Sequence, residues 1–186
     1  QQAPHPHPSM ETLLVLDRQL FFLINGSYHT SFLDWTMLLF SGVGTAGIIW
    51  FLLGVWLFFK EETKDKWFFA PLIGAGAVSW FLVEMILKPL VARSRPGLEL
   101  GAIIVGGQSD TFSFPSGHAT IAFAMAVVLA NKEPKWKWIF YLLAVVISLS
   151  RIYLGKHYPL DVLAGVLLGW GIGHLSLVIC YRIFKR

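Results

Sequence analysis

The stretch Ser150-Arg-Ile-Tyr-Leu-Gly-Lys-His-Tyr-Pro-Leu-Asp161 separates two long apolar runs, yet it carries an arginine, a histidine and an aspartate. Pro159 suits the first turn of a helix, where its missing N–H breaks no hydrogen bond. If that helix starts near His157, Asp161 lies four residues further along on the same face, within reach of the imidazole. Such a carboxylate can hold one imidazole nitrogen and leave the other free as a nucleophile. The alternative is an interfacial Arg151 and His157, with Asp161 as a helix-start charge.

The composition is that of a membrane protein. The 186 residues are 55% hydrophobic and 14% charged, with a mean hydropathy of +0.62, far less charge than a soluble domain carries. The net charge of +4 is therefore interpreted through topology, and we expect no nucleic-acid partner and no obligate protein partner. Cys180 is the single cysteine, and no histidine or cysteine array predicts a metal site or a cofactor.

The apolar runs predict an all-α integral membrane protein. Residues 12–24 are too short to span a bilayer and are interrupted by Asp17 and Arg18, which favours an amphipathic helix at the interface. We expect a bundle of five to six transmembrane helices behind that interfacial helix, and a long connection over residues 88–114. Residues 1–9 are expected to be a tail or a cloning remnant, and residues 10–186 a single membrane domain. The expected spans are residues 32–59 with a bend near Gly42–Gly44, then 67–87, 116–130, 138–154 and 160–181.

Individual side chains carry further expectations. Gly165 and Gly169 form a small-xxx-small pattern that predicts close helix packing. Glu84 precedes Lys88 by one helical turn, which predicts an ion pair. His29 lies in a turn and is expected to be solvated.

The distribution of basic residues predicts the orientation. Nine of the fifteen Lys and Arg residues fall in the two loops 60–66 and 131–137 and at the C-terminus, all on one side of the predicted bundle. The positive-inside rule makes that side cytoplasmic. The polar groups that could take part in catalysis then face the extracytoplasmic side of a bacterial inner membrane.

Three separated segments reach that outer side. They supply fixed cations, two imidazoles and a helix N-terminus, whose exposed N–H groups bind anions. Arginine forks match phosphate oxygens, so the cluster predicts a phosphate ligand. Arg93 and Lys156 flank the cluster, either as contacts to a headgroup or second phosphate or as solvated charges. The segments are Lys88 to Arg95-Pro96, Pro115-Ser116-Gly117-His118, and Ser150-Arg151 through His157 to Asp161.

The motifs Lys-x6-Arg-Pro, Pro-Ser-Gly-His and Ser-Arg-x5-His-x3-Asp resemble the three-part signature of the type 2 phosphatidic acid phosphatase family, whose core is similar to vanadium haloperoxidases. The resemblance implies that His157 is the nucleophile that forms a phosphohistidine, and that Asp161 orients it. His118 would be the general acid, and no metal is implied. The residues implied to bind the phosphoryl oxygens are Lys88, Arg95, Arg151, Ser116 and the Gly117 N–H.

The resemblance implies an integral-membrane lipid phosphatase that removes the terminal phosphate of a lipid phosphate or pyrophosphate, best matched by undecaprenyl pyrophosphate. Lipid A, phosphatidylglycerophosphate and phosphatidate phosphatases are alternatives, because the motifs recognise phosphate and not the lipid tail. A lipid-to-lipid phosphotransferase would share the phosphohistidine. A transporter is disfavoured because its polar groups usually lie at mid-membrane. A haloperoxidase is disfavoured because it needs a vanadate site that is accessible from water.

Overall fold

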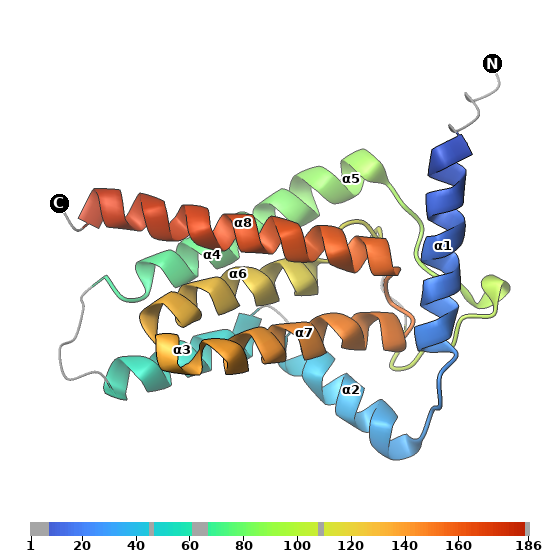
Figure 1. The fold of residues 1–186 in the computed structure, drawn as a ribbon, viewed down its shortest axis with the longest axis horizontal. Helices are drawn as coiled ribbons and strands as arrows, with labels where there is room; N and C mark the ends of the chain where they lie inside the picture. The colour runs from blue at the N-terminus through green and yellow to red at the C-terminus, as the bar shows by residue number, and fades with distance from the viewer. Residues whose placement is uncertain (1–7, 45–46, 61–66, 108–109, 185–186) are drawn as a thin grey trace.

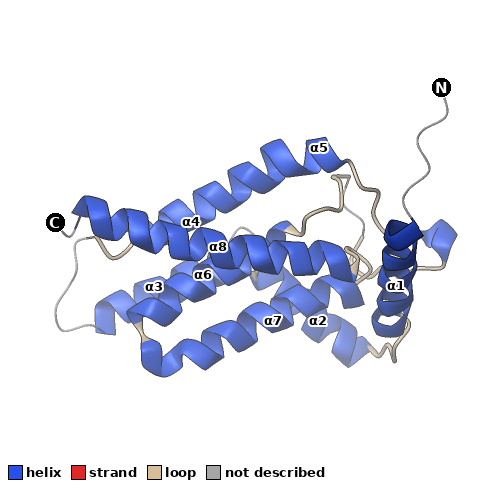
Figure 2. Cartoon of the chain, turned by 45° about the horizontal axis from the view of Figure 1, so that its top comes forward, coloured by secondary structure: helices blue, strands red, loops and turns tan. Residues whose placement is uncertain are grey.

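The chain is built from α-helices joined by loops (Figures 1 and 2), and the residues that the structure describes contain no strand. The computed structural model describes residues 8–44, 47–60, 67–107 and 110–184, so residues 1–7 of the expected tail and most of the charged loop 60–66 lie outside it. The all-α class is confirmed. The elements are α1 (Pro8–Asn25), α2 (Ser31–Val43), α3 (Ile48–Lys60), α4 (Ala70–Trp80), the π-helix η2 (Phe81–Leu87), α5 (Lys88–Val91), the 3₁₀ turn η3 (Leu98–Leu100), α6 (Gly117–Lys132), the 3₁₀ turn η4 (Pro134–Trp136), α7 (Lys137–Tyr153) and α8 (Pro159–Phe184).

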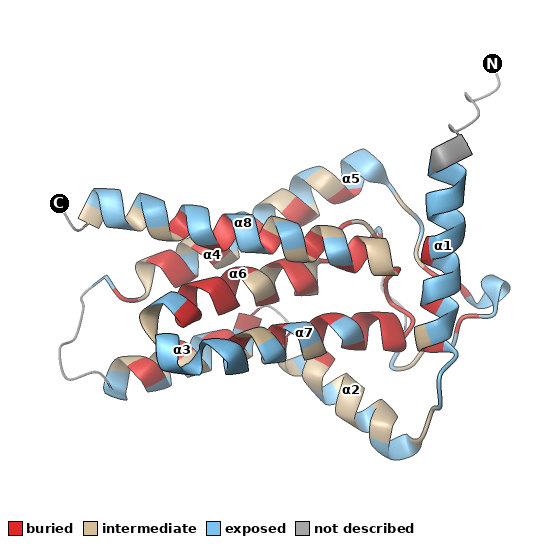
Figure 3. Cartoon of the chain, viewed as in Figure 1, coloured by how far each residue is buried: buried red, intermediate tan, exposed pale blue. Residues whose placement is uncertain are grey.

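Helix α6 is the central helix of the bundle. It packs against α4, α7 and α8, and Figure 3 shows it mostly in the colour of buried residues. Most of its buried residues are small or β-branched, which lets three neighbours approach it closely. The outer faces of the surrounding helices carry exposed large apolar side chains, as a bilayer requires.

The contact between α6 and α8 depends on glycines. A Cβ at Gly169 would lie 2.1 Å from the Thr120 carbonyl oxygen, and one at Gly165 would lie 2.6 Å from the Ser116 carbonyl oxygen. The predicted small-xxx-small packing is therefore confirmed. It brings the start of α8 against the start of α6, where the Ser116 N–H donates to the Asp161 carbonyl at 2.9 Å.

Helix α1 lies across one end of the bundle (Figures 1 and 2). Its outer face is apolar and exposed, but Asp17 and Asn25 are buried. The Asn25 side chain donates to the Ile103 carbonyl at 2.7 Å and to the Tyr153 carbonyl at 2.8 Å, and it accepts from the Ile103 N–H at 2.8 Å. Polar contacts therefore fix α1 on the ends of the other helices. Its placement at the membrane interface remains a prediction.

Three helical segments are long and apolar enough to cross a membrane, namely Ala70–Val91, Pro134–Tyr153 and Pro159–Phe184. The pair α2 and α3 adds a fourth if it is one broken span, with an angle of 66° between the two helices. This break agrees with the expected bend near Gly42–Gly44. Helix α6 has only 16 residues, so the expected count of five to six spans is not confirmed by length and hydropathy.

Two local expectations were wrong. Residues 88–91 are helical rather than the start of a long connection, because the wider turns of η2 carry the helix through Pro89 until Ala92 turns left-handed. His29 is half-buried rather than solvated. Its Nδ1 lies 2.7 Å from Asp34 Oδ1, and its ring stacks on Tyr153 with centroids 4.3 Å apart.

Candidate active site

The polar segments singled out in the sequence meet at one end of the bundle, where α5 and α7 end and α6 and α8 begin (Figure 1). Lys88 lies in α5 and Arg151 in the last turn of α7, while Asp161 lies in the first turn of α8. Arg95 and His157 come from the loops beside these ends. Rigid helix ends therefore position most of the cluster.

His157 is buried, with 1% of its surface exposed. Its Nε2 lies 3.2 Å from Arg95 Nη1. Its Nδ1 lies 3.5 Å from Ser113 Oγ and 3.7 Å from Asp161 Oδ2. Asp161 thus lies near Nδ1, and the Ser113 hydroxyl is the nearer group. That Asp161 orients the imidazole stays a prediction. Burial lowers the pKa of His157 to about 4 against the opposing effect of Asp161, so the imidazole is neutral and nucleophilic at pH 7.

The carboxylate of Asp161 is fully buried and satisfied on both oxygens. Oδ1 accepts from Arg93 Nη1 at 2.6 Å, and Oδ2 accepts from Ser113 Oγ at 2.5 Å and from the Tyr158 N–H at 2.8 Å. Both terminal nitrogens of Arg93 are therefore engaged, because it lies between Asp161 and the buried Asp17.

Lys88 and Arg95 are held by acceptors around the site. Lys88 Nζ donates to Glu84 Oε1 at 2.7 Å, which confirms the predicted ion pair, and to Thr111 Oγ1 at 3.2 Å. Arg95 donates to the backbone carbonyls of Thr111 and Lys156 at 2.7 Å each and to that of Phe112 at 3.2 Å. Backbone carbonyls carry no net charge, so these hydrogen bonds hold Arg95 in place without neutralising its positive charge.

Arg151 is buried and uses only part of its fork. Its Nη1 donates to Ser41 Oγ from α2, while its Nε is buried and has no hydrogen-bond partner among the residues that the structure describes. Ser116 is the N-cap of α6, but its hydroxyl makes no capping bond and is likewise buried and unpartnered in that part of the chain. Buried donors normally find acceptors, so these two are suited to an anion.

His118 belongs to the same cluster. The charges of Arg151, His157, Lys88 and Arg95 all act on its imidazole. Gly117 precedes it at the start of α6, and a Cβ there would lie 3.0 Å from Glu84 Oε1, so a glycine allows the close approach of α6 to η2. The structure thus brings together every residue that the sequence singled out for phosphate chemistry.

Several site residues were missed by reasoning from the sequence. Ser113 and Thr111 lie in a connection without secondary structure, and Ser41 lies far away in α2, so no spacing pattern related them to the motifs. Asp17 did leave a signal, because it interrupts the apolar run of α1 together with Arg18. Its partner Arg93 was noticed in the sequence, but its direction could not be inferred.

An apolar groove opens beside the site. It has a volume of about 680 Å³ and lies between α1 and the segment after α5. Its apolar wall includes Leu13 and Leu14 of α1 and Leu100, and Arg95 also lines it. A hydrocarbon chain in this groove would therefore end near the cations.

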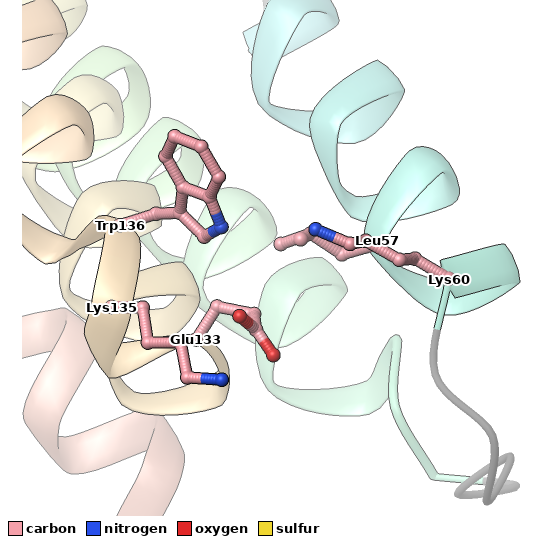
Figure 4. A pocket seen from close by; sticks show the side chains of 5 residues that line it. All are labelled: Leu57, Lys60, Glu133, Lys135 and Trp136. Carbon is pink, nitrogen blue, oxygen red and sulfur yellow. The ribbon is translucent and has the colours of Figure 1, made fainter.

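A second pocket, of about 320 Å³, lies near the opposite, basic end of the bundle and is lined by Leu57, Lys60, Glu133, Lys135 and Trp136 (Figure 4). Lys60 Nζ lies 5.5 Å from the ring centroid of Trp136. This arrangement is a cation–aromatic contact of the kind common at membrane interfaces.

Comparisons with known proteins agree on one family. Residues 67–185 match the model described as the PAP2 superfamily. The chain is 35% identical over 167 residues to an undecaprenyl-diphosphatase of Sulfolobus acidocaldarius, covering 87% of this chain and 77% of the relative. It is 31% identical to a lipid A 4'-phosphatase of Bacteroides thetaiotaomicron, covering 95% of this chain and 82% of the relative. The crystal structure of Aquifex aeolicus LpxE is 36% identical and covers 88% of this chain and 95% of its own, with a TM-score of 0.75.

Proposed function

The chain belongs to the PAP2 superfamily and is a lipid phosphate hydrolase, and from this premise we propose that it removes the terminal phosphate of a lipid pyrophosphate, with undecaprenyl pyrophosphate as the best candidate. The reaction would proceed through a phosphohistidine at the extracytoplasmic face of a bacterial inner membrane. An undecaprenyl-diphosphatase among the relatives favours this substrate, and a lipid A 4'-phosphatase keeps that class as the second candidate.

The observation that carries the proposal is a neutral, buried imidazole beside donors that are suited to an anion. His157 Nε2 faces Arg95 at 3.2 Å, and Arg151 Nε and Ser116 Oγ are buried without partners among the described residues. Phosphoryl transfer mainly requires in-line positioning and stabilisation of charge on the equatorial oxygens. Arg95, Arg151, Lys88, Ser116 and the Gly117 N–H would supply that stabilisation.

The first step forms a bond between His157 Nε2 and the terminal phosphorus and breaks the bond from that phosphorus to the bridging oxygen. His118 donates a proton to the leaving oxygen. In the second step His118 accepts a proton from water, the water oxygen attacks phosphorus, and the N–P bond breaks to release phosphate. Asp161 stabilises the positive charge on His157, through Ser113 and across the 3.7 Å to Nδ1.

The apolar groove beside Arg95 favours a substrate with a long hydrocarbon chain. A chain lying against Leu13 and Leu14 of α1 would reach the cations from the side of the bilayer, without crossing the protein. A soluble phosphate ester would gain nothing from that groove, because hydrophobic stabilisation scales with the apolar area buried.

The test is phosphate release from a panel of detergent-solubilised lipids, comparing undecaprenyl pyrophosphate, lipid A and phosphatidylglycerophosphate at equal detergent dilution, with chelator present. We expect the pyrophosphate to turn over fastest and His157→Ala to be inactive on every lipid. Equal activity of His157→Ala and the parent would refute the proposed nucleophile. Product analysis with an added acceptor lipid separates hydrolysis from phosphotransfer.

A further inference from the structure

Lys156 is a buried cation that the phosphoryl-binding set above does not use. It is 5% exposed, and its Nζ has no hydrogen-bond partner among the described residues. Its backbone carbonyl accepts from Arg95 Nη1 at 2.7 Å, and its backbone N–H donates to the Arg151 carbonyl at 2.9 Å. The backbone of Lys156 is therefore fixed to Arg95 and to Arg151.

No negatively charged side chain among the described residues forms an ion pair with Lys156. Within the described ranges no carboxylate pairs with Arg95, Arg151 or Lys156, whereas Lys88 pairs with Glu84 and Arg93 pairs with two aspartates. Burial lowers the pKa of Lys156 to about 8, and the charges of Arg151 and Arg95 act in the same direction. A buried cation without an anion is unfavourable, so a bound anion would stabilise three cations at once.

We infer that Lys156 binds the inner phosphoryl group of a lipid diphosphate, beside the terminal group held by Arg95 and Arg151. This inference rests on the proposed function and adds a second subsite to the same site. When His157 Nε2 attacks the terminal phosphorus, the bond to the bridging oxygen breaks and a lipid monophosphate leaves. Lys156 stabilises the negative charge that develops on this leaving group. A lipid monophosphate has no inner phosphoryl group and makes no use of Lys156.

The experiment compares farnesyl diphosphate with farnesyl monophosphate, which share one tail and differ in one phosphoryl group. The full chain in detergent is assayed for phosphate release as the parent, Lys156→Met and Lys156→Arg, and Lys135→Met is the matched control at the opposite end. A hydrogen bond to a charged group predicts that Lys156→Met lowers kcat/KM for the diphosphate about tenfold or more and changes the monophosphate value less than about threefold. Lys156→Arg keeps the charge and retains most of the preference for the diphosphate.

An equal loss on both substrates, or no loss on the diphosphate, overturns the role of Lys156. That result leaves the phosphatase itself in place, because it concerns only the ratio between the two substrates. Retained activity of His157→Ala would instead overturn the proposed function. The two failures are therefore distinguishable in one set of assays.

A second inference rests on different contacts, those of the buried Asp17 in α1. Asp17 Oδ2 accepts from Arg93 Nη2 at 2.5 Å, and Arg93 Nη1 donates to Asp161 Oδ1 at 2.6 Å. Asp17 Oδ1 also accepts from the Leu160 N–H at 2.8 Å, beside Asp161 in the chain. Two routes therefore connect Asp17 to the carboxylate that faces His157.

The geometry points to Asp17 as a positioning residue for the reaction, acting on Asp161 through Arg93. The guanidinium of Arg93 is held between the carboxyl groups of Asp17 and Asp161, which fixes its direction toward Asp161. An amide at position 17 would bind Arg93 more weakly and let it shift. The orientation of Asp161 toward His157 would then be less well defined, while the cations that bind phosphate stay in place.

The test compares Asp17→Asn with Asp34→Asn, a matched loss of a carboxylate that binds Tyr153 and His29 instead of Arg93. Loss of one charge-assisted hydrogen bond predicts that Asp17→Asn lowers kcat about tenfold with KM changed less than about twofold, while Asp34→Asn keeps kcat. The double variant should fall no further than Arg93→Gln alone, because Asp17 acts on Asp161 through Arg93. Unchanged kcat in Asp17→Asn, or additive losses in the double variant, overturn the inference, and a change in thermal stability alone does not support it.

Discussion

Replacement of Ser113 by alanine tests how Asp161 acts on His157, the proposed nucleophile. Ser113 is buried, and its hydroxyl donates to Asp161 Oδ2 at 2.5 Å while lying 3.5 Å from His157 Nδ1. The direct distance between Asp161 Oδ2 and Nδ1 is 3.7 Å, beyond a hydrogen bond. The hydroxyl lies nearer to Nδ1 than the carboxylate does, so we expect it to help the carboxylate to orient the imidazole.

The structure sets the size of the expected effect. Ser113→Ala removes one hydrogen bond to a charged acceptor, which contributes about 1.5–3 kcal/mol. Asp161 keeps Arg93 at 2.6 Å and the Tyr158 N–H at 2.8 Å, so the carboxylate stays ionised and close to its place. If this stabilisation is lost in the transition state, where the imidazole becomes positively charged, kcat falls about tenfold to a hundredfold. This conversion uses about 1.4 kcal/mol per factor of ten.

The assay is phosphate release from farnesyl diphosphate in detergent, with kcat and KM measured separately. Ser27→Ala is the control, because Ser27 is an exposed serine whose hydroxyl donates to the Ile24 carbonyl at 2.6 Å, in the turn after α1. We expect Ser113→Ala to lose kcat with little change in KM, and Ser27→Ala to match the parent. A Ser113→Ala enzyme with kcat within about twofold of the parent would refute the role of the hydroxyl as a relay.

Three further predictions concern protonation, anion binding and packing. The pKa of His157 is about 4 in the folded protein against 6.5 for a free imidazole, so the unfolded chain takes up a proton at higher pH than the folded protein does. The contribution of His157 to stability is therefore complete above pH 6.5 and falls by about 3 kcal/mol toward pH 4. The thermal midpoint of His157→Gln should accordingly fall less than that of the parent as the pH is lowered. Orthovanadate should inhibit the enzyme as a phosphate mimic, and Arg151→Ala should weaken that inhibition in dose–response assays. A chelator should change neither the activity nor its inhibition by orthovanadate. Gly169→Ala places a Cβ 2.1 Å from a carbonyl of α6 and should lower stability by about 1–3 kcal/mol, whereas Gly171→Ala, with nothing within 4 Å, should not lower the thermal midpoint in detergent.

The sequence predicted the convergence of the site because each motif lies beside the end of an apolar run. Helices that cross one bilayer in alternating directions bring such ends to the same face. Arg151 and Asp161 therefore had to lie close to Gly117, and the close packing through Gly165 and Gly169 followed from residue size alone.

The side-chain partners could not be inferred in the same way. Arg93 follows the positive-φ Ala92, and the backbone turn there decides whether its fork points to solvent or to Asp161. Ser113 and Thr111 lie in a connection whose course depends on tertiary contacts. The helical residues 88–91 were also assigned to a connection, because a π-helical stretch before a proline has no clear pattern in sequence.

The contacts of Asp161, the carboxylate beside the proposed nucleophile, explain why the site keeps its positive charge. An aspartate among several cations would normally form an ion pair with the nearest one and reduce the attraction for phosphate. Here Arg93 already occupies Asp161 Oδ1, and Asp17 completes the coordination of Arg93 from α1. The charges of Arg95, Arg151 and Lys156 are then left for the substrate, while Asp161 still acts on His157. A helix that lies across the end of the bundle thereby separates the charge beside the proposed nucleophile from the charges proposed to bind phosphate.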